Sequence, residues 1–177
     1  MIRQKGHLKP SKMIPSLVVS NRSAQEVEAI RYLEFCIEER GKGGLGTTDA
    51  VIHNFLLSLY VKHQRGKVLE YLDKQFVPEK RAIPGDDDAA AASVVFDRKK
   101  VYFDVNYVLR LCSQPKEAGA SAVSAQLRRA CVLLHCMLGQ LDQAVELALE
   151  DGDLEQAKFC LKIRTVNSGT DDYSGKS

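Results

Sequence analysis

The chain has no long apolar run, no marked excess of either charge and no CxxC pair, and each absence removes a class of protein. No stretch approaches the roughly 18 apolar residues that a transmembrane helix needs. The 25 basic and 23 acidic side chains leave a formal net charge of +2, whereas proteins that bind nucleic acid usually present a basic stripe. Residues 1–19 are basic but contain no continuous apolar region, so we expect no signal peptide.

Cysteine occurs five times, an odd number, and always inside an apolar helical pattern. The five are Cys36, Cys112, Cys131, Cys136 and Cys160. This usage predicts reduced, cytosolic thiols that pack as small hydrophobes. Cys131 and His135 share one helix face, but two ligands do not make a zinc site. We therefore expect no metal and no cofactor.

Residues 127–162 predict three short helices in succession, separated by left-handed helix ends at Gly139 and Gly152. Asp153 with Gln156 is spaced as a capping box for the third helix. The residues expected to point inward are Leu127, Ala130, Cys131, Leu134 and Leu138, then Leu141, Ala144, Val145 and Ala148, then Leu154, Ala157 and Leu161. Helices of about three turns are not stable alone. Stacked hairpins bury such stripes, so the pattern predicts an all-α fold, an α-solenoid of helical hairpins.

The first half of the chain has the same character. Helices are expected over about 10–18, from 23 to about 40, over 49–62, from about 68 to just before Pro78, and over 102–112. Arg65-Gly66 is expected to be a turn. Ser23 and Glu26 form a capping-box spacing, and Thr47, Thr48 or Asp49 caps the helix at 49–62. The apolar stripe expected on that helix is Val51, Ile52, Phe55, Leu56, Leu59 and Tyr60.

The predicted solenoid spans residues 10–163, between a disordered N-terminus at 1–9 and a disordered tail at 164–177. Loops or insertions interrupt it at 41–46, 78–100 and 113–123, where glycine, proline, alanine and charged residues replace the apolar stripe. The sequence gives little indication of β-strands, because the apolar run Val94-Val95-Phe96 is too short to form one.

No enzyme signature is found in the sequence. His53 and His63 fall on different faces of one helix and are expected at the surface. Aromatic residues off the main stripes, namely Phe35, Tyr71 and Phe159, are candidate partner-interface positions. The alternative is that they fill the next layer between helices. Two other functions stay open: a helical-repeat adaptor that binds peptides or partner helices, and a small thiol enzyme that uses Cys131 or Cys136.

Four stretches carry a family resemblance: AIRYLEFC at 29–36, IHNFLLSLY at 52–60, YFDVNYVLRLC at 102–112 and QAVELALEDGDLEQAK at 143–158. In this order they resemble the C-terminal helical region of the vacuolar protein sorting-associated protein 18 (deep orange) family. Full-length members carry an N-terminal β-propeller and a C-terminal RING zinc domain. This sequence has no blade-like strands and no downstream CxxC pairs, so we expect a fragment, a truncated gene model or a shortened relative.

The resemblance implies a non-enzymatic subunit of the HOPS and CORVET membrane-tethering complexes. Its partners would be other tethering subunits, bound through helical ridges, and the SNARE machinery, with indirect membrane association and no nucleic acid. The implied location is cytoplasmic, on the surface of late endosomes and of the vacuole or lysosome.

Overall fold

The computed structural model describes the chain in five stretches. They are residues 10–19, 23–38, 44–78, 93–113 and 121–166. Residues 1–9, 79–92 and 167–177, for which the sequence predicts disorder, lie outside the described residues.

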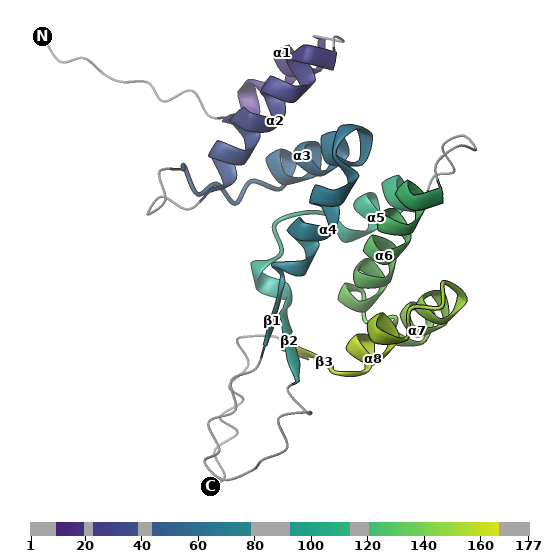
Figure 1. The fold of residues 1–177 in the computed structure, drawn as a ribbon. Coiled ribbons are helices and arrows are strands. Elements are labelled where there is room, and N and C mark those ends of the chain that lie inside the picture. The colour runs from purple at the N-terminus through teal and green to yellow at the C-terminus, as the bar shows by residue number, and fades with distance from the viewer. Residues whose placement is uncertain (1–9, 20–22, 39–43, 79–92, 114–120, 167–177) are drawn as a thin grey trace, which may run out of the picture.

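Most of the described residues are helical. Eight α-helices occur in this part of the chain: α1 (Ile14–Val19), α2 (Ser23–Ile37), α3 (Ala50–His63), α4 (Arg65–Asp73), α5 (Val105–Ser113), α6 (Ser121–Met137), α7 (Leu141–Glu150) and α8 (Leu154–Leu161). Short 3₁₀ turns occur at η1 (Pro10–Lys12) and η4 (Arg98–Lys100). Figure 1 shows the helices following one another through the molecule, from α1 at one end to α7 and α8 at the other. The predicted helices are confirmed, most of them to within a few residues at each end. The turn expected at Arg65-Gly66 is wrong, because these two residues begin α4.

The helices stack as hairpins. α3 and α4 form one hairpin, and α5 and α6 form the next. α3 packs on α5 and α4 packs on α6, so one hairpin lies on the other. α6 then packs on α7, which pairs with α8. Each hairpin contacts its sequence neighbours, which is the arrangement of an α-solenoid. One continuous core of buried apolar side chains runs from α2 to the residues after α8.

Most local signals at the helix ends act as predicted. The carboxylate of Asp49 accepts a hydrogen bond from the N–H two residues later, at 3.0 Å, and caps α3. Asp153 caps α8 by accepting from the N–H of Gln156, also at 3.0 Å. The Gln156 side chain donates instead to the Arg129 carbonyl oxygen, so only the Asp153 half of the predicted capping box forms. Gly139 and Gly152 have φ angles of 78° and 72°. This left-handed conformation ends α6 and α7 at little steric cost only because neither residue has a Cβ.

Glu26 connects two helices. Its carboxylate accepts a hydrogen bond from Lys62 Nζ at 2.6 Å and also contacts His63 Nε2, both on α3. Hydrogen bonds between charged groups are stronger than those between neutral groups, so Glu26 holds α2 to α3. His63, expected at the surface, is therefore partly buried.

A small sheet joins segments that are far apart in the chain. β1 (Phe76–Pro78) pairs antiparallel with β2 (Val94–Asp97), and β2 pairs parallel with β3 (Ile163–Val166). In Figure 1 the sheet lies below α4 and next to α8. The expectation that Val94-Val95-Phe96 is too short for a strand is wrong. β2 and η4 occupy the end of the predicted insertion at 78–100, and β3 overlaps the predicted tail, so regular structure extends past the stacked helices.

Aromatic packing explains why such short strands form. Phe96 is 1% exposed, and its ring centroid lies 5.4 Å from that of Phe76, its direct partner across the two strands. Phe159 of α8 packs edge-on against Phe76, with centroids 5.6 Å apart. Cross-strand aromatic pairs stabilise short sheets. The three rings therefore fix the sheet against the helices.

Two predicted apolar stripes are oriented differently in the structure. Leu154 and Leu161, expected inward, are 61% and 74% exposed, whereas Ala157 and Cys160 are buried. Each helical residue turns by about 100°, which places both leucines about a quarter of a turn from the buried face of α8. Val51, expected in the stripe of α3, is also exposed. No helix in the described stretches has both the length and the apolarity to cross a bilayer.

Candidate interaction surfaces

Phe35, on α2, is the most exposed of the three aromatic residues proposed as interface positions, at 44%. Leu45, in the loop after α2, is exposed beside it, and its N–H donates to the Phe35 carbonyl oxygen at 3.1 Å. Val27, two turns earlier on α2, is also exposed. An exposed aromatic side chain with apolar neighbours suits a protein contact.

Tyr71, on α4, points into the molecule. Its hydroxyl forms a hydrogen bond with His53 Nδ1 on α3 at 2.5 Å, and its ring packs edge-on against buried Phe103, with centroids 5.8 Å apart. Burial raises the pKa of the Tyr71 phenol above its usual range. Tyr71 therefore occupies a layer between helices, which is the alternative that the sequence left open, and its role at an interface stays a prediction.

His53 is buried, at 5% exposure, so the expectation that it lies at the surface is wrong. Its Nε2 lies 2.9 Å from the carbonyl oxygen of Thr47, which can only accept, so this nitrogen carries the proton and Nδ1 accepts from the Tyr71 hydroxyl. Burial lowers the pKa of His53 and favours this neutral ring. His53, Leu57 and Tyr60 repeat at i, i+4 and i+7, and this second buried face of α3 is the signal that identifies His53 as interior.

Phe159, on α8, is partly buried by Phe76 and lines a cavity of about 200 Å³ between α4, α6 and α8. Asp73 and Arg129 line the same cavity. Burial raises the pKa of the Asp73 carboxyl, although Arg129 opposes this effect. The cavity is small and mixed in charge, so Phe159 as a partner-interface residue also stays a prediction.

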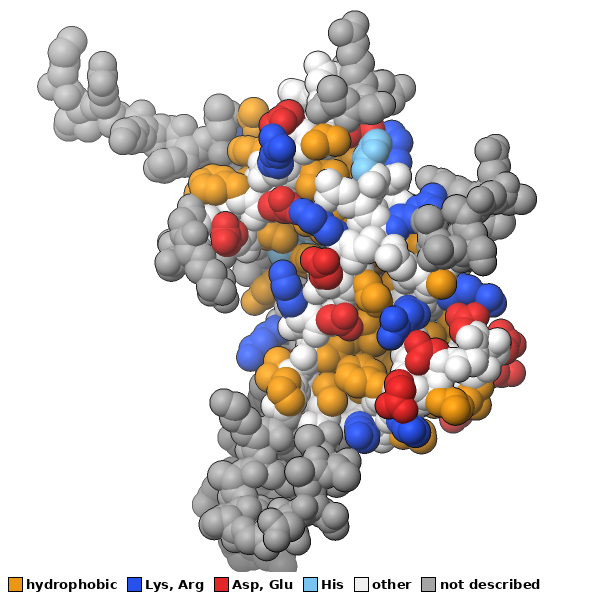
Figure 2. Space-filling model, in the orientation of Figure 1, with side chains coloured by type: hydrophobic (Ala, Val, Ile, Leu, Met, Phe, Trp, Pro, Cys, Tyr) orange, Lys and Arg blue, Asp and Glu red, His pale blue; other side chains and the backbone are white. Residues whose placement is uncertain are grey.

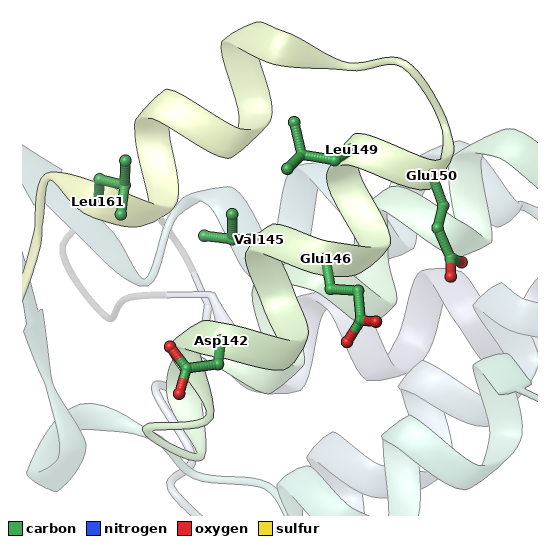
Figure 3. Close-up of a pocket in the computed structure, with 6 residues that line it drawn as sticks. All are labelled: Asp142, Val145, Glu146, Leu149, Glu150 and Leu161. Atoms are coloured by element: carbon green, nitrogen blue, oxygen red, sulfur yellow. The ribbon is translucent and has the colours of Figure 1, made fainter.

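An open groove lies along α7 and reaches the end of α8 (Figure 3). Its volume is about 610 Å³, and six residues line it: Asp142, Val145, Glu146, Leu149, Glu150 and Leu161. Figure 3 shows Val145 and Leu149 on the side of α7 that faces α8, where Leu161 lies. The three carboxylates lie along the other edge of α7. We call this feature the α7–α8 groove.

The α7–α8 groove combines an apolar side with an acidic one. Leu149 is 51% exposed, and Leu161 is more exposed still. Figure 2 shows hydrophobic and acidic side chains beside one another over this end of the molecule. The groove is not predicted from the sequence, because the helical spacing places Leu161 in the interior and gives Leu149 no distinguishing signal. Their exposure depends on how α7 and α8 pack, which spacing along one helix does not specify.

The thiols are buried, as predicted, and all five cysteines are free. Cys136 and Cys160 lie with their sulfur atoms 3.4 Å apart. A hydrogen bond from Cys112 lowers the pKa of Cys131 to about 7, yet burial between α5 and α6 keeps Cys131 from a substrate. In the part of the chain that the structure describes, no group of three or more His, Cys, Asp or Glu side chains is placed to hold a metal ion.

Comparison of this chain with known proteins identifies the family to which it is similar. Residues 1–172 match the family model described as "VPS18, alpha-solenoid domain, second half". The chain is 33% identical over 165 residues to the vacuolar protein sorting-associated protein 18 homolog of Danio rerio, covering 92% of this chain and 13% of that protein. The Drosophila melanogaster homolog is 30% identical over 149 residues, with 84% and 12% covered. Vacuolar sorting protein 18 of Arabidopsis thaliana is 31% identical over 133 residues, with 74% and 10% covered.

No solved structure matches the chain significantly. The chain spans only about an eighth of the length of the animal relatives, as the 13% and 12% coverage shows. The match extends over nearly the whole chain, and the stacked hairpins are those of a solenoid. The chain therefore belongs to the VPS18 family, and it corresponds to the second half of the α-solenoid domain of that family.

Proposed function

We propose that this chain is a non-enzymatic scaffold segment of a HOPS- or CORVET-like tethering complex at the endosome and the vacuole or lysosome. In this role it supports vesicle docking and fusion and protein transport to the vacuole. The single observation that supports this most is the stack of hairpins with one continuous core. Such a stack offers a long outer surface on a stable support, which suits assembly with other proteins.

Exposed apolar side chains lie at both ends of the stack. Phe35 and Val27 lie on α2 with Leu45 in the loop after it, and the α7–α8 groove, which is apolar on one side and acidic on the other, lies at the opposite end (Figure 1). We propose that other tethering subunits bind such helical surfaces, with Phe35 as a direct contact. Tyr71 and Phe159 are proposed as secondary contacts, through the part of each side chain that the neighbouring aromatic rings leave exposed. Membrane association would be indirect, and contact with the SNARE machinery would come through the assembled complex.

A chimaera tests this proposal. The matching segment of the Danio rerio relative is replaced by this chain, and the tethering subunits that co-purify with it are measured in cells that lack the endogenous protein. We expect the chimaera to recover the same subunits as the intact relative and to restore delivery of cargo to the vacuole or lysosome. A relative from which the segment is deleted should lose at least one subunit.

Two substitutions make the test specific. Phe35→Ala in the chimaera should reduce subunit recovery without changing helicity. Val51→Ala changes another exposed apolar residue, on α3, and should leave recovery unchanged. The scaffold role would be contradicted if a folded chimaera recovered no tethering subunit, or if the relative without this segment still recovered every subunit.

A further inference from the structure

We propose that the α7–α8 groove docks a basic amphipathic helix of a partner protein. Apolar side chains of that helix would pack on Val145, Leu149 and Leu161, while its lysine or arginine side chains would face Asp142, Glu146 and Glu150. This inference rests on the scaffold role proposed above and names the class of partner that this surface accepts. An amphipathic helix in a hydrophobic groove is a common mode of protein recognition.

The shape of the groove fits one helix. The groove follows α7, whose ten residues are about 15 Å long, so an occupant of about three turns covers it. Leu149 and Leu161 are more than half exposed, and they come from two helices that are packed together. Their spacing is therefore fixed before the partner arrives, which reduces the entropic cost of binding.

The charge of the groove selects a basic partner. Asp142, Glu146 and Glu150 follow one another at intervals of four residues, or about 6 Å along the helix axis. In the described part of the chain no side chain forms an ion pair with any of the three. The neighbouring acids differ: Asp151 pairs with Arg128 at 2.8 Å, and Asp153 pairs with Arg129 at 3.2 Å.

The position of these carboxylates makes the free groove electrostatically unfavourable. Like charges four residues apart on a helix repel each other. Glu150 also lies at the C-terminal end of α7, where the helix dipole is negative and where the last turn holds no basic residue. Cations placed along this edge relieve both effects, and they also accelerate association with a basic partner.

Other occupants fit less well. A second copy of this chain offers the exposed face of α8, with Leu154 and Leu161 beside Lys158 and Lys162, and Lys158 already binds Glu155 at 2.8 Å. Two cations, one of them already paired, do not match three carboxylates. An anionic membrane surface would be repelled by the acidic edge. The unpaired acids beside apolar side chains therefore point to a basic helix from another protein.

Peptide binding to the complete chain tests the proposal. The probe is a designed helical peptide of about four turns, with leucines along one face and three lysines, spaced four residues apart, along the adjoining edge. A scrambled peptide of the same composition is the control, and fluorescence anisotropy measures affinity. We expect the designed peptide to bind at least tenfold more tightly than the scrambled one, with an advantage that shrinks as salt rises.

Variants of the chain locate the site. Glu146→Lys should weaken binding about tenfold, and a peptide in which the facing lysine is replaced by glutamate should restore it. Leu149→Ala should also weaken binding, whereas Leu154→Ala, which removes an even more exposed leucine outside the groove, should not. Circular dichroism checks that each variant keeps its helicity. Equal binding of both peptides, or no effect of Glu146→Lys in a folded variant, would overturn the proposal.

Two further measurements separate this inference from the scaffold role. If sedimentation shows a dimer that Leu149→Ala dissociates, the groove belongs to a second copy and the inference fails. If the chimaera recovers its subunits but the designed peptide does not bind, the inference fails while the scaffold role stands. If the peptide binds with the expected charge dependence but the chimaera recovers no subunit, the groove is supported and the scaffold role fails.

Discussion

Replacing Phe96 tests whether the small sheet is an integral part of the fold. Phe96 lies in the central strand, β2, and is 1% exposed. Its ring packs on Phe76, which in turn packs on Phe159 of α8. Phe96→Ala removes a ring that contributes to holding β1, β2 and α8 together. The sheet would be dispensable only if these contacts added little to the free energy of unfolding.

The expected loss is large for a domain of this size. Truncating a buried phenylalanine to alanine typically costs about 3–5 kcal/mol. The total free energy of unfolding of a natural domain is about 5–15 kcal/mol. Since each kcal/mol lowers the melting temperature by about 2–8 °C, depending on domain size, Phe96→Ala should melt at least about 6 °C below the original chain.

Thermal unfolding followed by circular dichroism, repeated in urea, measures this difference. Val77→Ala is the matched control, because Val77 lies in the adjacent strand but is 56% exposed. It should change stability by less than about 0.5 kcal/mol. If Phe96→Ala and Val77→Ala melt at the same temperature, the sheet does not stabilise the solenoid and the reasoning is refuted.

Three further predictions concern protonation, helix ends and thiols. Burial lowers the pKa of His53 below its ordinary value of 6.5 in the folded chain. As the pH falls, the unfolded chain therefore binds a proton at His53 before the folded chain does, so the free energy of unfolding should be at its full value above about pH 6.5 and should decrease below it. His53→Gln should weaken this pH dependence. Gly139→Ala and Gly152→Ala place a Cβ on left-handed backbone, so each should lower the free energy of unfolding in urea by about 1–2 kcal/mol. Gly66→Ala is the control, because Gly66 lies inside α4 and an added Cβ would meet only ordinary contacts there; it should leave the stability unchanged or raise it. A thiol reagent should label the five buried cysteines slowly in the native chain and rapidly in denaturant, and fast native labelling of Cys131 would revive the thiol-enzyme hypothesis.

The helices can be predicted from the sequence because their signals are local. The caps at Asp49 and Asp153 and the left-handed glycines at 139 and 152 act within a few residues of their own positions. The sheet depends instead on contacts between distant segments: Val94 pairs with Ile163, and Phe96 pairs with Phe76. No spacing within Val94-Val95-Phe96 reveals these partners.

One of the two candidate surfaces can be predicted from the sequence, and the other cannot. The exposure of Phe35 agrees with its position off the main stripe of α2, which the sequence displays. Leu161 repeats at helical spacing with Ala157 and Leu154, yet it is exposed, because α8 presents a different face to α6 and α7. The rotation of a helix about its own axis is set by tertiary packing. Local periodicity alone therefore cannot identify the α7–α8 groove.

The sheet also affects how this segment acts as a scaffold. In a solenoid each hairpin contacts only its neighbours, so small rotations between hairpins accumulate along the stack. Here β1 follows α4, β2 and η4 precede α5, and β3 follows α8, so the sheet connects the ends of three successive hairpins. Such a connection opposes rotation of one hairpin against the next. The α7–α8 groove belongs to the last of the hairpins that the sheet connects, whereas α2 packs on α3 at the other end of the stack (Figure 1). The sheet therefore opposes movement of the groove relative to the α3–α4 hairpin.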